Sequence, residues 1–73
     1  MMRLVANNYE PHETFKILRE WTGLTQEQLA NELNRRSRHG IKNIETGNAR
    51  FYYETILEIC KKHNIKIVFE KDN

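Results

Sequence analysis

The stretch from residue 24 to residue 47 constrains this chain most, because it encodes two short helices separated by a few polar residues. A Thr-x-x-Gln capping box begins at Thr25 and marks the start of the first helix. The second helix of this pair, over about residues 38–46, carries apolar residues only at Ile41 and Ile44, and Gly47 follows it as a helix stop. The sequence therefore predicts a close pair of helices, the second of which is polar over most of its surface.

The flanking sequence predicts two more helices and a strand around this pair. Pro11 suits a first helical turn, and Gly23 stops that helix. The residues from Ile65 to Glu70 are rich in β-branched side chains and alternate in part, which predicts a strand. We expect helices over about 11–22, 26–33, 38–46 and 54–63. The predicted fold is one mainly α domain over residues 1–73, with a four-helix core over about 11–64 and a short C-terminal β-strand over about 65–70.

Two motifs in the central stretch carry a family resemblance. The first reads Leu-Thr-Gln-x-x-Leu-Ala from Leu24, and the second reads Ile-x-x-Ile-Glu-x-Gly from Ile41. Together they resemble the phage-repressor type of helix-turn-helix domain (lambda repressor, Cro and Xre-like) over about residues 15–65. The resemblance implies a four-helix lambda-repressor-like fold and a transcriptional regulator that binds specific double-stranded DNA. A repressor and an antitoxin-like autoregulator are both consistent with it, and the latter would add a toxin as protein partner.

The resemblance also implies which side chains contact DNA. The start of the third helix and the residues one turn later face the major groove, where Arg can pair with guanine and Asn with adenine. Phosphate contacts come from the start of the second helix, the turn and the loop after the third helix. The expected base contacts are Arg38, His39, Lys42 and Asn43, and the expected phosphate contacts are Gln26, Arg35, Arg36, Asn48 and Arg50. Arg19 and Glu45 match a charged pair typical of the family.

The distribution of charge supports a polyanionic partner. Between Arg35 and Arg50 five basic residues stand against one acidic residue, which gives +4. The rest of the chain holds seven basic and nine acidic residues, which gives −2. A local basic face on an otherwise acidic body suits DNA. The alternative is an ordinary solvated face that has no partner.

Three positions depart from the family pattern. The turn at Asn34 to Ser37 is one residue longer than the usual Gly-x-Ser, although Asn tolerates the left-handed conformation. Gly40 lies inside the third helix, where it costs about 1 kcal/mol relative to Ala. Phe51 and Tyr52 replace the usual Pro-Ser before the fourth helix. These departures bear on individual base contacts more than on the fold.

The predicted strand needs a partner for its backbone hydrogen bonds. One candidate is the same strand of a second chain, which would form a homodimer through Ile65–Glu70 and place two recognition helices on a palindromic operator. The other candidate is the segment Arg3–Ala6 of the same chain. We favour the homodimer, because small domains gain stability from association.

The sequence offers no catalytic, cofactor or membrane signal. Cys60 and His63 provide only two potential zinc ligands, and the three histidines form no nucleophile–base arrangement. A single cysteine and the lack of a long apolar run favour a cytoplasmic protein outside the membrane. We therefore expect no enzyme and no cofactor. The rival interpretation is a protein-interaction module without DNA activity, which the exposed aromatic run from Phe51 and the Ile17–Trp21 pair would support.

Overall fold

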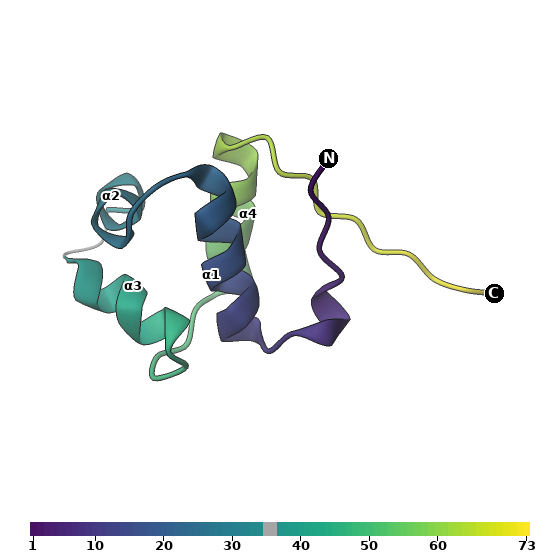
Figure 1. Cartoon of the computed structure of the whole chain (residues 1–73), viewed down its shortest axis with the longest axis horizontal. Helices are drawn as coiled ribbons and strands as arrows, with labels where there is room; N and C mark the ends of the chain where they lie inside the picture. Colours follow the sequence, from purple (N-terminus) through teal and green to yellow (C-terminus); the bar gives the residue numbers. More distant parts are fainter. Residues whose placement is uncertain (35–36) are drawn as a thin grey trace.

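The structure, a computed structural model, describes residues 1–34 and 37–73 and is mainly helical (Figure 1). Its elements are a short 3-10 helix η1 (Ala6–Asn8) and the α-helices α1 (Pro11–Thr22), α2 (Gln26–Glu32), α3 (Arg38–Glu45) and α4 (Tyr53–Lys62). α3 packs against both α2 and α1, and α1 also packs against α4. Among the described residues the four α-helices follow one another as predicted, with bounds that differ by one residue at most.

Local capping signals explain where most of the helices begin and end. At the start of α2 the backbone N–H of Gln28 donates to Thr25 Oγ1 at 3.1 Å, and the backbone N–H of Thr25 donates to Gln28 Oε1 at 2.9 Å. Gly23 and Gly47 follow α1 and α3 with φ of 76° and 83°, a left-handed conformation that glycine adopts without strain. Ser37 occupies the N-cap position of α3, but its side chain makes no capping hydrogen bond to the helix.

The core lies between the four helices and fixes the orientation of α3. Its buried side chains are Phe15, Leu18, Leu29, Ala30, Ile41, Ile44, Ile56, Ile59 and Cys60. Phe51 packs on this cluster with its ring centroid 5.1 Å from that of Phe15, so this residue adds to the core, whereas the neighbouring Tyr52 is exposed. Burial raises the pKa of the Cys60 thiol, which therefore acts as a small apolar side chain.

The C-terminal strand is not present, and this prediction is corrected. Within residues 1–34 and 37–73 the structure contains no strand, and residues 65–73 follow an irregular path away from α4 (Figure 1). A strand exists only through hydrogen bonds to a neighbouring backbone. The in-chain candidate Arg3–Ala6 does not supply them, because no backbone hydrogen bond among the described residues joins this segment to residues 65–70.

The C-terminal segment is nevertheless divided between core and solvent. Ile65 and Ile67 pack against the core cluster, whereas Val68 and Phe69 are 60% and 85% exposed. Both terminal segments lie beyond α1 and α4, on the side away from α2 and α3 (Figure 1). The two ends of the chain are thus separate from the face that α3 presents.

The turn before α3 keeps one feature expected from its sequence. Asn34 adopts a left-handed conformation with φ of 57°, which asparagine tolerates. Arg35 and Arg36, which were expected to contact phosphate, lie outside the described residues.

His63, which directly follows α4, contacts a carboxylate of α2. Its Nε2 lies 2.9 Å from a carboxylate oxygen of Glu32, which links the end of α4 to the end of α2. His63 is partly buried and has this carboxylate as its polar partner. No helix among the described residues has the length and apolar character needed to span a membrane.

Candidate nucleic-acid interface

One face of α3 is polar and open, and the opposite face is buried. Ile41 and Ile44 are 0% and 2% exposed and hold the helix against the core. The remaining positions of the first two turns point away from the core. They are Arg38, His39, Lys42 and Asn43, the four side chains that were expected to contact bases, and all four are exposed. The structure thus places them on one accessible surface.

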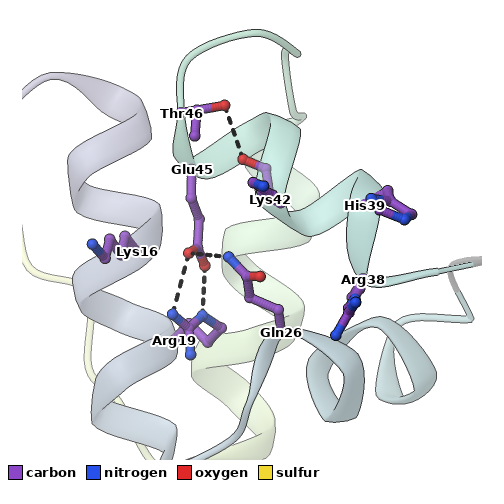
Figure 2. A pocket seen from close by; sticks show the side chains of 8 residues that line it. All are labelled: Lys16, Arg19, Gln26, Arg38, His39, Lys42, Glu45 and Thr46. Atoms are coloured by element: carbon purple, nitrogen blue, oxygen red, sulfur yellow. Dashed lines mark hydrogen bonds and ion pairs between the residues drawn. The ribbon is translucent and has the colours of Figure 1, made fainter.

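A hollow of about 500 Å³ lies beside this face, at the junction of three helices. Its side chains come from α1, the start of α2 and the length of α3 (Figure 2). They are Lys16, Arg19, Gln26, Arg38, His39, Lys42, Glu45 and Thr46, which we call the basic hollow. Residues far apart in the sequence therefore contribute to one site next to the exposed face of α3.

Glu45 is the buried carboxylate behind the basic hollow. Arg19 Nε donates to Glu45 Oε2 at 2.6 Å, and Arg19 Nη2 donates to Oε1 at 3.2 Å. Gln26 Nε2 donates to the same Oε1 at 3.0 Å, as Figure 2 shows. Glu45 is only 8% exposed, so these three bonds replace the water that its charge has lost. The arrangement ties α1, α2 and α3 together at one point.

The network also fixes how Gln26 can meet a ligand. A carboxylate accepts hydrogen bonds and does not donate them, so the amide group that Gln26 turns toward Glu45 is the NH₂. One N–H and the carbonyl oxygen of the Gln26 side chain remain for another partner. A phosphate accepts hydrogen bonds, so of the groups in the Gln26 side chain it can use only the remaining N–H.

Arg19 uses three of its five N–H donors inside the protein. Besides its two bonds to Glu45, its Nη1 donates to the backbone oxygen of Leu24 at 2.9 Å. Its side chain is 14% exposed, against 3% for the side chain of Glu45. The opposite charges of Arg19 and Glu45 therefore neutralise each other within the site. The bond to Leu24 also holds the loop before α2.

The loop after α3 folds back on the end of that helix. The backbone N–H groups of Asn48 and Ala49 both donate to the backbone oxygen of Asn43, at 2.8 Å and 3.0 Å. Asn48 Nδ2 also donates to Thr46 Oγ1 at 3.2 Å. These bonds fix the loop that carries Arg50, whose side chain is exposed. Asn48 and Arg50 thus follow α3 directly in the chain, whereas Gln26 precedes it at the start of α2.

The electrostatic character of the basic hollow follows from this pairing. Since Arg19 neutralises Glu45, the charges left at the rim are those of Lys16, Arg38 and Lys42. Such a cluster of cations attracts an anion.

Within residues 1–34 and 37–73, no group of three or more His, Cys, Asp or Glu side chains is arranged to hold a metal ion.

Lys16, like Thr46, lines the basic hollow but was not among the residues expected from the sequence. The usable signal was its spacing, because Lys16 precedes Arg19 by three residues and therefore shares a helix face with it. Once Arg19 was expected to reach Glu45 on the third helix, Lys16 could have been placed next to the same helix.

These features define a class of protein, the small helix-turn-helix regulators that bind DNA. Comparison with protein families agrees with the geometry: the Helix-turn-helix domain family matches residues 13–65, a range that includes α2, α3 and α4 and most of α1. The chain belongs to this family. Comparisons with curated proteins and with solved structures found no match.

Proposed function

We propose that this protein binds specific sequences of double-stranded DNA with α3 in the major groove and acts as a transcriptional repressor. The observation that carries the proposal is the exposed polar row of α3 on a helix whose other face is fixed in the core. An α-helix fits the major groove, and residues in its first turns reach the base edges. A domain bound at a promoter blocks transcription without any further activity.

Each side chain in this row has a defined task in the proposal. Arg38 offers a planar pair of donors suited to guanine, and Asn43 offers one donor and one acceptor suited to adenine. Lys42 and His39 supply further donors to bases. Gln26, Asn48 and Arg50 contact the phosphates on both sides of α3, together with Arg35 and Arg36, which lie outside the described residues.

The test is selection of bound sequences from a random pool of duplex DNA, followed by the same selection with variants. Arg38→Ala and Asn43→Ala should each relax the preference at particular base pairs, at about 1–3 kcal/mol per lost contact. Arg50→Ala should weaken binding to all sequences alike. An unchanged sequence preference in both α3 variants would show that α3 does not read bases.

We further propose that the protein binds a palindromic operator as a homodimer, with contacts through residues 65–70. The exposed Val68 and Phe69 support this proposal, because a second copy would remove their apolar surfaces from water. A two-fold axis would then relate the two recognition helices. Their half-sites should lie about one helical turn of DNA apart, or a multiple of it.

A second candidate function is a protein-interaction module, which includes binding to a toxin in an antitoxin-like system. Tyr52 and Tyr53 favour it, since they are 76% and 50% exposed at the start of α4 and aromatic residues are enriched in protein interfaces.

Salt dependence of DNA binding distinguishes DNA binding from the protein-interaction module. DNA binding through several phosphates should weaken steeply with added salt, with a slope near −0.9 in log–log form per phosphate, whereas an absence of binding at low salt would favour the interaction module.

A further inference from the structure

We propose that Lys16 of α1 contacts a DNA backbone phosphate at the edge of the basic hollow. The inference rests on the proposed DNA binding and adds a third helix to the interface, beyond α3 and the start of α2. It concerns a side chain outside the two helices of the helix-turn-helix.

The position of Lys16 is the first step of the argument. It is an exposed residue of α1, one turn before Arg19, and it lines the basic hollow together with Lys42 and Thr46 of the α3 end. Figure 2 shows Lys16 on α1, across the Glu45 side chain from α3. A ligand that covers the exposed face of α3 and extends over the hollow therefore meets Lys16 at its margin.

The charge of Lys16 is available for such a ligand. The salt bridges found in residues 1–34 and 37–73 involve Arg19, Lys62 and His63, and none of them involves Lys16. The nearest carboxylate in the hollow, that of Glu45, is already bound by Arg19 and Gln26. Lys16 and Lys42 are then like charges beside one hollow, and an anion placed there gains from both.

A phosphate suits this place better than a base edge. With α3 in the major groove, the elements on either side of α3 face the two backbones that form the groove walls. α1 is such an element, because it packs against α3. Lysine is a compact charge on a flexible stem, which binds phosphate without demanding one geometry.

The test is Lys16→Gln in the full chain, with binding measured on the duplex selected by the wild-type protein across a series of salt concentrations. Losing one phosphate contact should reduce the steepness of the log–log salt dependence by about 0.9 and weaken binding about eightfold at 0.1 M salt. The preferred sequence should stay the same. Because Lys16 is exposed, the circular dichroism spectrum and the melting temperature should not change.

Lys61→Gln is the matched control. Lys61 is also an exposed helical lysine, but it lies in a separate depression on α4 with Glu54 and Glu58. Removing its charge should leave both the affinity and the salt dependence at the wild-type values. An equal effect of the two substitutions would reflect net charge alone and would contradict a contact at Lys16.

A second measurement locates the phosphate. Uncharged methylphosphonate groups are placed one at a time along the duplex, and one of them should weaken the wild-type protein but not Lys16→Gln. The proposal fails if wild-type DNA binding depends on salt and Lys16→Gln matches it in every measurement. It also fails if Lys16→Gln alters the preferred sequence, which would make Lys16 a base contact. Absence of any wild-type DNA binding would instead overturn the proposed function and this inference with it.

Discussion

At the scale of single residues, Glu45 shows how a buried charge can organise a binding surface. Removing a carboxylate from water is costly, and here three N–H donors from Arg19 and Gln26 compensate for the loss. The two donor residues come from α1 and α2, while Glu45 ends α3. The relative position of α3, and of the side chains it presents, therefore depends on this one carboxylate.

Replacing Glu45 should reveal this dependence. Glu45→Ala leaves Arg19 without its carboxylate partner in a site that is mostly closed to water, so we expect a loss of about 3–5 kcal/mol in the free energy of unfolding. Urea denaturation monitored by circular dichroism measures it. Glu58→Ala is the control, because Glu58 and Lys62 form an ion pair on α4 in which both side chains are 45% exposed. That substitution should cost no more than about 0.5 kcal/mol, and equal losses in the two variants would contradict the role given to Glu45.

The base-contacting residues and the hydrogen-bond network differ in how far the sequence predicts them. The polar row of α3 follows from helical periodicity, since Ile41 and Ile44 mark the buried face and the four expected base-contacting residues fall outside it and are exposed. The bond from Gln26 to Glu45 joins residues 19 apart in the sequence. Its existence depends on how α2 crosses α3, which no local pattern specifies.

At the scale of secondary-structure elements, two glycines of the α3 region have opposite roles. Gly40 lies within α3, and a Cβ built on it would meet nothing within 4 Å. Gly47 ends the helix with φ of 83°, and a Cβ there would lie 3.5 Å from the His12 ring. The first glycine weakens its helix without a steric reason inside this chain, whereas the second permits the chain to turn.

The two corresponding alanine variants should therefore change stability in opposite directions. Gly40→Ala should raise the free energy of unfolding by up to about 1 kcal/mol, because alanine favours the helix. Gly47→Ala should lower it by about 1–2 kcal/mol, because an L-residue is strained in the left-handed conformation. Thermal and urea unfolding of the two variants provide the measurement. A loss of stability in Gly40→Ala would show that the glycine serves the fold itself.

The same Gly40→Ala variant also tests the place of α3 on DNA. If the helix backbone approaches the bases closely at this position, the added methyl group should weaken DNA binding while it stabilises the protein. This combination distinguishes a binding role for Gly40 from a structural one.

Elements with local signals were predictable, and the element that needs a distant partner was not. Thr25, Gly23 and Gly47 mark helix ends through contacts within a few residues, so the helix bounds could be read from the sequence. The β-branched run after Ile65 has strand character, but hydrogen-bond partners are a matter of the whole fold. In the single chain, packing of Ile65 and Ile67 on the core decides the path of this segment.

At the scale of the whole molecule, the polar and apolar surfaces lie on different sides. The exposed face of α3 and the basic hollow lie with α2 and α3, whereas the terminal segments lie beyond α1 and α4 (Figure 1). The exposed Val68 and Phe69 are part of the C-terminal segment. A second copy bound there would leave the DNA-facing surface of each chain free, which is what a dimer on a palindromic operator requires.

The C-terminal segment allows dimer formation to be separated from folding. Replacing Val68 and Phe69 together with Ser should convert a dimer into a monomer, because it removes exposed apolar surface that only a second copy would cover. The stability of the monomer should change by no more than about 0.5 kcal/mol, as is usual for surface substitutions. Replacing Ile65 and Ile67 with Ala should instead lower stability at every protein concentration, since both side chains pack on the core. Sedimentation and thermal unfolding over a range of concentrations distinguish these effects, and a wild-type protein that stays monomeric at micromolar concentration, with and without operator DNA, would rule out the dimer.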